Sequence, residues 1–215
     1  VSREEGYRVS VDSLRSSMSP LTRLLMLASP ANPTGAVISN AELASLLSVL
    51  RERAGSYLLV DEIYQGLQYT GDIETALALG GDDVIVLNSF SKYFGMTGWR
   101  VGYIAAPHDL IAAAIKVQQN VMLSICSFGQ AGAVAALKGD QACVTRMVNE
   151  FDRRRRTILQ GIENTPGLTC PVAPKGAFYV FAKHDVPGMN TSELADHLLE
   201  KGGVAVVPGT SFGTR

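Results

Sequence analysis

The chain has 215 residues, 47% of them hydrophobic and 18% charged, which is enough material for one large domain or two small ones. Its formal net charge of −1 gives no electrostatic footprint for nucleic acid or an anionic membrane, and no apolar run approaches the ~20 residues of a membrane span. Three cysteines without CxxC spacing argue against a disulfide framework and favour a reducing compartment, so we expect a cytoplasmic protein. Three scattered histidines form no metal-binding pattern. We therefore expect no binding to metal, nucleic acid or membrane.

The first predicted elements are a strand, a turn and a helix. Residues 22–28 form a short apolar run, and residues 29–35 (SPANPTG) follow it as a turn rich in residues that break regular structure. Ser39 and Glu42 make a capping box for an amphipathic helix, which we expect to end at Gly55.

Three further apolar runs predict the rest of a mostly parallel sheet. They lie at residues 57–60, 84–87 and 101–105. The strand–helix–strand order is that of a βαβ unit, in which a helix joins two parallel strands. No GxGxxG motif follows the first strand, which argues against a dinucleotide-binding fold.

Residues 108–164 have a helical pattern, with the expected break between two helices at Gly139 and Asp140. Apolar side chains recur at helical spacing within residues 141–164, and we interpret this stripe as core. It consists of Val144, Met147, Val148, Phe151, Ile158 and Ile162. We interpret the arginine run at 153–156 as a solvated helix face.

The last part of the chain predicts a second, smaller α/β domain. Residues 168–172 and 178–182 have the pattern of paired strands. Asn190 with Glu193 caps another helix, and residues 204–207 have the pattern of a final strand.

Polar residues follow the strand at 84–87 in the stretch NSFSKYFGMTGWR, residues 88–100. Open α/β sheets bind ligands at the carboxyl ends of their strands. Hydroxyls, a lysine and an arginine there suit a phosphorylated ligand beside an amine nucleophile; the alternative is a solvated loop with two ordinary surface cations. Asp61 ends another strand, where an acidic residue is either a helix cap or a ligand partner.

The motifs NSFSK, in this stretch, and GWRVGY, at its end, closely resemble the lysine signature of the class I/II aminotransferases, which depend on pyridoxal phosphate. Other blocks are similar to that family and stand in its order: SPANPTG at 29–35, VDEIYQGLQYTG at 60–71, PKGAFYVF at 174–181 and VVPGTSFG at 206–213. The resemblance implies a pyridoxal phosphate-dependent transferase of fold type I. We therefore expect residues 1–140 to be part of the large, mostly parallel-sheet α/β domain, and residues 141–215 to be a connecting helix and part of a smaller C-terminal α/β domain.

The resemblance implies a catalytic role for three residues. Lys92 would form a Schiff base with pyridoxal 5′-phosphate and move the proton at the substrate α-carbon. Asp61 would keep the ring nitrogen protonated, and Tyr64 would lie beside the phenolic oxygen. Without the resemblance, a solvated lysine is an equally good interpretation of Lys92, and Tyr64 is more simply a half-buried core tyrosine.

Cofactor binding would involve the same three residues together with Asn32, Ser89 and Arg100. Asn32 matches the asparagine that hydrogen-bonds the phenolic oxygen, whereas Ser89 and Arg100 match the phosphate contacts. Arg100 should dominate that pair, because a guanidinium stays charged and gives two parallel hydrogen bonds to phosphate.

The implied activity is the transfer of an amino group between an amino acid and a 2-oxo acid, by a homodimer. Against the family pattern the chain resembles an internal fragment that lacks the N-terminal part and the C-terminal end. The family's arginine for the substrate carboxylate lies downstream of residues 206–213, and Arg215 is too close to that block to be it. We therefore expect the fragment to be inactive alone. The alternatives are a pyridoxal phosphate-dependent C–S lyase and an aminotransferase-like sensing domain of a transcription regulator.

Overall fold

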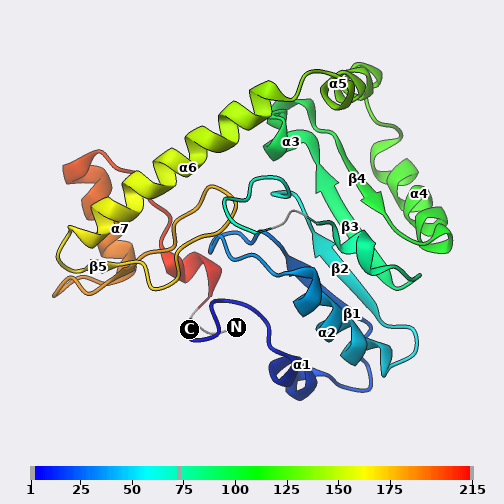
Figure 1. Ribbon diagram of the computed structural model, residues 1–215, viewed down its shortest axis with the longest axis horizontal. Coiled ribbons are helices and arrows are strands. Elements are labelled where there is room, and N and C mark those ends of the chain that lie inside the picture. Colours follow the sequence, from blue (N-terminus) through cyan, green and yellow to red (C-terminus); the bar gives the residue numbers. More distant parts are fainter. Residues whose placement is uncertain (1–2, 72–73, 214–215) are drawn as a thin grey trace.

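The computed structural model describes residues 3–71 and 74–213 (Figure 1). A four-stranded sheet lies at its centre, in the order β1 (Leu24–Ala28), β2 (Tyr57–Asp61), β3 (Val84–Ser89) and β4 (Gly102–Ala105). The first three strands are parallel, and β4 runs antiparallel to β3. The four strands predicted in the first half of the chain are therefore confirmed, as is the mostly parallel sheet.

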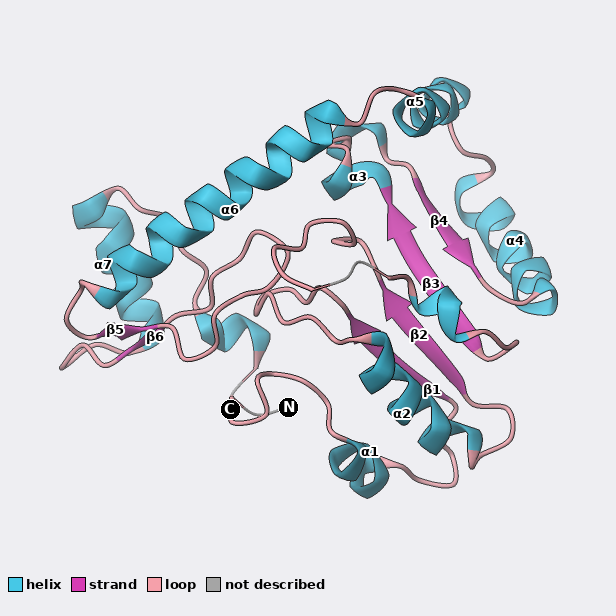
Figure 2. Ribbon diagram, in the orientation of Figure 1, coloured by secondary structure: helices cyan, strands magenta, loops and turns pink. Residues whose placement is uncertain are grey.

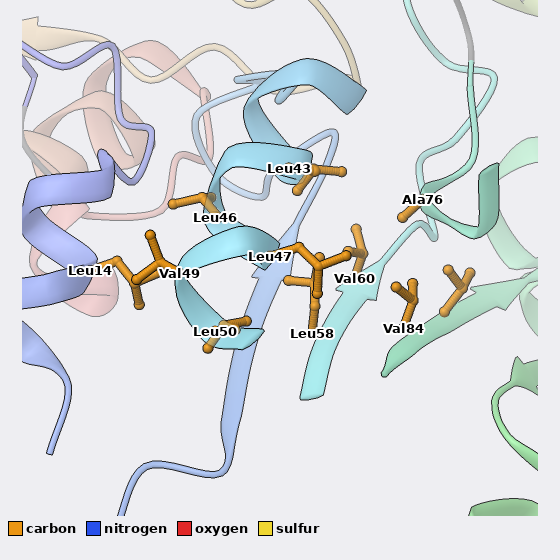
Figure 3. Packing of buried hydrophobic residues seen from close by; sticks show 11 residues of the cluster. Leu14, Leu43, Leu46, Leu47, Val49, Leu50, Leu58, Val60, Ala76 and Val84 are labelled. Atoms are coloured by element: carbon orange, nitrogen blue, oxygen red, sulfur yellow. The ribbon is translucent and has the colours of Figure 1, made fainter. Parts of the chain in front are cut away.

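Helix α2 (Asn40–Arg51) covers one face of this sheet and is the centre of the largest core cluster. The predicted capping box is present: Ser39 Oγ accepts from the Glu42 N–H at 3.3 Å, and Glu42 Oε2 accepts from the Ser39 N–H at 2.9 Å. Leu47 of α2 lies next to Leu58 and Val60 of β2 (Figure 3). A short helix that the sequence did not predict, α1 (Val11–Ser17), packs on α2 and adds Leu14 to the core.

Three helices, not the predicted two, follow the sheet: α4 (His108–Met122), α5 (Ser127–Lys138) and α6 (Ala142–Glu163). The expected break at Gly139 and Asp140 separates α5 from α6, but a second break lies at residues 123–126. No glycine or proline marks it, and Leu123 adopts a left-handed φ of 61° after α4. In the described ranges, no helix is long and apolar enough to cross a membrane.

The far end of α6 leads to a two-stranded antiparallel pair, β5 (Leu168–Thr169) and β6 (Lys183–His184), and to α7 (Thr191–Gly202) with its predicted capping box (Figure 2). The predicted pairing of 168–172 with 178–182 is wrong, because β6 begins after that run. The predicted strand at 204–207 is also wrong. A strand needs a hydrogen-bonded neighbour, and within the described chain no strand lies beside this exposed run.

The arginine run on α6 is only partly a solvated face. The side chain of Arg155 is 18% exposed, against 63–67% for Arg153, Arg154 and Arg156. Arg155 donates to the Pro174 carbonyl at 3.3 Å and lies 5.1 Å from the centre of the Tyr69 ring. The predicted apolar stripe of α6 is mixed as well, since Val144 and Ile162 are buried but Ile158 is half exposed. The division into two domains at residue 140 stays a prediction.

Candidate active site

The carboxyl ends of β1, β2 and β3 meet at one edge of the sheet. Asp61 at the end of β2 is in register with Ala28 of β1 and Leu87 of β3. The Asp61 carbonyl accepts from the Ser29 N–H at 3.1 Å, which starts the SPANPTG turn at the same edge. The turn, Asp61 and the lysine stretch after Leu87 therefore leave the sheet side by side, as the sequence predicted.

Asp61 and Glu62 point to opposite faces of the extended chain, and they are used differently. Glu62 is buried and accepts from the Ala76 N–H at 2.6 Å and from Thr75 Oγ1, and burial raises its carboxyl pKa. Asp61 is half-buried, and its Oδ1 accepts from the Ile63 N–H at 3.0 Å. Asp61 thus caps the following turn with one oxygen, while its other oxygen accepts no hydrogen bond from the described residues.

A short helix, α3 (Phe90–Tyr93), carries Lys92 and starts directly after β3. Ser89 caps it: its hydroxyl accepts from the Ser91 N–H at 3.0 Å and donates to the Val101 carbonyl at 3.1 Å. The exposed Arg100 adopts a left-handed φ of 54°, and its guanidinium donates to the Thr97 carbonyl at 3.0 Å. Ser89 therefore ties the start of the lysine stretch to the residue that follows Arg100.

Tyr64 is 4% exposed and its hydroxyl is hydrogen-bonded to the hydroxyl of Tyr179. Burial raises the pKa of Tyr64 above its usual value, and the bond to Tyr179 adds to this shift. The Phe178 ring contacts both Tyr64, at 5.3 Å between ring centres, and Lys92, whose Nζ lies 5.9 Å from the Phe178 centre. Phe178 and Tyr179 received no role from the sequence, although their block, PKGAFYVF, carried the resemblance; an aromatic pair between two glycine- and proline-rich segments was the available signal.

Three blocks that are far apart in the sequence are joined by backbone hydrogen bonds. The Gly35 carbonyl accepts from the N–H groups of Lys175 and Gly176, at 2.9 and 3.0 Å, and the Leu67 carbonyl accepts from Ala177 at 2.8 Å. A Cβ on Gly35 would lie 2.3 Å from Pro174 Cβ, so only glycine allows this approach. These contacts bring the turn at 29–35, the segment after Asp61 and the loop that carries Phe178 together.

The predicted site residues are gathered to different degrees. Tyr64 and Lys92 share the Phe178 ring, and Asp61 and Ser89 lie on neighbouring strand ends. Asn32 is exposed in the turn, and its amide forms no hydrogen bond with the part of the chain that the structure describes. Arg215 lies outside the described residues.

Two cavities flank this region. One of about 280 Å³ is lined by Gly66, Asn88, Ser89, Phe90 and Tyr93, among others, next to the lysine helix. A larger one of about 460 Å³ is lined by Glu62, Gln68 and Lys175, on the side of α2, and neither cavity is lined by Asp61 or Lys92. The donor chemistry therefore locates the candidate site better than cavity size does.

The set of donors fits pyridoxal 5′-phosphate. Asp61 offers a carboxylate oxygen for a protonated ring nitrogen, and Tyr64 stays protonated and can donate to a phenolic oxygen. Lys92 offers an amine beside an aromatic ring, and Arg100 a guanidinium for phosphate. Ser89 would have to exchange its bond to the Val101 carbonyl for one to a phosphate oxygen.

Comparisons with known proteins give a consistent answer. The family model described as "Aminotransferase class I and II" matches residues 1–215. The chain is 39% identical to an aspartate aminotransferase of Streptomyces avermitilis and 36% identical to one of Rhizobium meliloti; each match covers 97% of this chain and 54% of the relative. The chain thus spans about half the length of the curated relatives it matches.

Solved structures agree. The fold is similar to the aspartate aminotransferase from Rhizobium meliloti, with a TM-score of 0.92 and 34% identity over 100% of this chain and 57% of that one. It is equally similar to an aromatic aminotransferase from Pyrococcus horikoshii, with a TM-score of 0.92, 34% identity, and coverage of 100% and 58%. The predicted α/β transferase fold is confirmed.

Proposed function

Since the chain belongs to the class I and II aminotransferases, we propose that it supplies the cofactor-binding part of an enzyme that transfers an amino group between an amino acid and a 2-oxo acid with pyridoxal 5′-phosphate. The observation that carries the proposal is the shared contact of Lys92 and Tyr64 with the Phe178 ring, at the sheet edge where Asp61 ends β2. Two relatives are named aspartate aminotransferases, which supports aspartate as the first amino acid to test.

Each residue has a defined role in this proposal. Pyridoxal 5′-phosphate, when bound, supplies an electron sink for the bond electrons of the substrate α-carbon. Lys92 would hold the cofactor through its amine, and the same amine would take the proton from the substrate α-carbon. Asp61 keeps a proton on the ring nitrogen, because a carboxylate within hydrogen-bond reach favours the charged form of its partner.

The remaining residues bind and orient. Tyr64 and Asn32 donate to the phenolic oxygen, and Ser89 and Arg100 hold the phosphate, with the guanidinium as the stronger partner. The neutral phenol of Tyr64 suits this task, because burial keeps its proton in place.

We propose a cytoplasmic homodimer for the longer protein. The support is an exposed apolar face on α4 that a second subunit could cover. This helix buries no side chain completely and exposes Val117, Val121 and Met122.

The test is cofactor binding by this chain and by the full-length protein. We expect pyridoxal 5′-phosphate to give a visible absorption band, and borohydride reduction followed by peptide mass mapping to place the label on Lys92. Lys92→Ala should abolish both signals, whereas Lys116→Ala, on the exposed helix α4, should keep them. A band of equal strength in both variants would refute the proposed role of Lys92. Amino-acid substrates are then tested on the full-length protein, with aspartate first.

A further inference from the structure

The hydroxyl pair of Tyr64 and Tyr179 is not explained by packing alone. Tyr64 follows β2 in the first half of the chain, and Tyr179 lies on the loop before β6. Their rings meet edge to face with centres 5.5 Å apart, and their hydroxyl oxygens are hydrogen-bonded. A tyrosine hydroxyl donates one hydrogen and accepts at two lone pairs, so one member of the pair donates and the other retains a hydrogen for a further partner.

Tyr179 is held from outside the candidate site. The preceding residue but one, Ala177, is fully buried and donates its N–H to the Leu67 carbonyl at 2.8 Å. The Ala177 carbonyl accepts from the Tyr69 hydroxyl. Both bonds hold the backbone of Ala177, two residues before Tyr179, so the scaffold holds the start of the segment that carries the Tyr179 hydroxyl.

The environment of Tyr64 determines which of the two hydroxyls donates the hydrogen bond. Burial raises the pKa of Tyr64, so near neutral pH it carries its proton. The charged groups at this place are the Asp61 carboxylate and, across the Phe178 ring, the Lys92 ammonium. Without a ligand, the Tyr64 hydrogen can point to Tyr179. An anionic oxygen placed next to Tyr64 would attract that hydrogen, and Tyr64 would then need a new donor for its own lone pair.

We propose that Tyr179 is a positioning residue that acts through Tyr64: when an anionic ligand oxygen takes the Tyr64 hydrogen, Tyr179 reverses its role and donates to Tyr64. The inference rests on the proposed function, in which that oxygen is the phenolate of pyridoxal 5′-phosphate. Donation by Tyr179 polarises the Tyr64 O–H bond, and a chain of two hydrogen bonds binds the anionic oxygen more strongly than one. A phenylalanine at position 179 would keep the ring contacts and lose this chain.

The first experiment needs no cofactor. Urea unfolding of the wild type, Tyr64→Phe, Tyr179→Phe and the double variant forms a double-mutant cycle. The double variant should shift the midpoint by less than the sum of the two single shifts, because either substitution already removes the bond. Additive shifts would overturn the pairing and, with it, the inference.

The second experiment measures the bound cofactor by its spectrum and not by turnover, in the full-length protein. Stabilisation of the phenolate lowers the pH at which the visible band of the Lys92-bound cofactor titrates. Tyr64→Phe should raise that midpoint by roughly 1 unit and Tyr179→Phe by a few tenths of a unit. The double variant should match Tyr64→Phe, because Tyr179 acts only through Tyr64.

Tyr57→Phe is the control, since it removes the hydroxyl of a half-buried tyrosine at the start of β2, the end of that strand opposite to Asp61. It should leave the spectral midpoint unchanged. An unchanged spectral midpoint in Tyr179→Phe, or a double variant that exceeds Tyr64→Phe, would overturn the inference. Absence of any Lys92-dependent band in the wild type is a different result: it refutes the proposed function, and Tyr179 is then a structural partner only.

Discussion

Replacement of Arg155 by alanine should destabilise the protein far more than replacement of its neighbour Arg153. Both lie on α6 and both pair with an acidic residue one turn away, Arg155 with Asp152 and Arg153 with Glu150. Only Arg155 also reaches another segment, through the Pro174 carbonyl and the Tyr69 ring. The two substitutions remove the same charge from the same helix, so their difference reports the contacts of Arg155.

The size of the effect follows from those contacts. A hydrogen bond from a charged donor contributes about 1.5 kcal/mol at the lower end of its range, which suits the 3.3 Å distance between Arg155 and the Pro174 carbonyl. The contact with the Tyr69 ring contributes about 0.5–1 kcal/mol. Asp152 keeps a second partner in Arg156, at 3.3 Å, so it is not left unpaired. We expect Arg155→Ala to lower the free energy of unfolding by about 2 kcal/mol.

Urea unfolding followed by circular dichroism measures this difference. With a denaturant slope of about 2 kcal/mol per M, the midpoint of Arg155→Ala should fall by roughly 1 M at an unchanged slope. Arg153→Ala should move it far less, because that guanidinium is solvated and its ion pair is screened. Equal shifts for the two variants would refute the assignment of Arg155 as an anchor of the loop at 174–181.

Other substitutions test other parts of the structure. Gly66→Ala should cost clearly more stability than Gly55→Ala in urea unfolding: both glycines have a positive φ, which costs about 1–2 kcal/mol in alanine, but only at Gly66 would the new Cβ meet Tyr93, at 2.3 Å. Equal losses of stability in the two variants would contradict the packing of the Tyr93 ring against Gly66. Glu62→Gln should become more stable relative to wild type as the pH rises from about 4 to 8. Burial raises the pKa of the Glu62 carboxyl in the folded state above the ordinary 4.5. The stability that the protonated carboxyl contributes is therefore fully present below pH 4.5 and is lost as the pH rises through the folded-state pKa, whereas glutamine does not titrate. A pH-independent difference would argue against this. Leu50→Ala should lower the free energy of unfolding by about 2–5 kcal/mol in thermal unfolding, because the Leu50 side chain of α2 is fully buried in the core cluster. A loss below about 1 kcal/mol would contradict that packing.

The sequence predicted the sheet well because its signals are local. The strands at β1, β2 and β3 are apolar runs, and the caps at Ser39 and Asn190 have their partners three residues away. Asp61 and Ser89 follow strands, so their meeting at one edge of the sheet was predictable from strand direction alone.

The errors concern features that depend on contacts between distant segments. Residues 178–182 form a continuous apolar run like that of a strand, but the backbone of their loop is hydrogen-bonded to two turns instead of a neighbouring strand. Arg155 is indistinguishable from its three arginine neighbours in the sequence, and only its contacts with Pro174 and Tyr69 separate it from them. For the same reason the partner of Tyr64 could not be named before the loop at Tyr179 was placed next to it.

The junction of these loops also has a consequence for the order in which the protein folds. Tyr69 and Ala177, which are hydrogen-bonded, are 108 positions apart, whereas the unit from β1 to β2 closes over a short helix. Because distant contacts form only after a long segment of chain has been ordered, we expect the β1–α2–β2 unit to fold early and the candidate site to assemble late. In a refolding experiment with pulsed hydrogen exchange, the amide of Ala177 should therefore gain protection after that of Tyr57, whose N–H donates to the Arg23 carbonyl next to β1. A newly made chain would hold the β1–α2–β2 unit before the candidate site is complete.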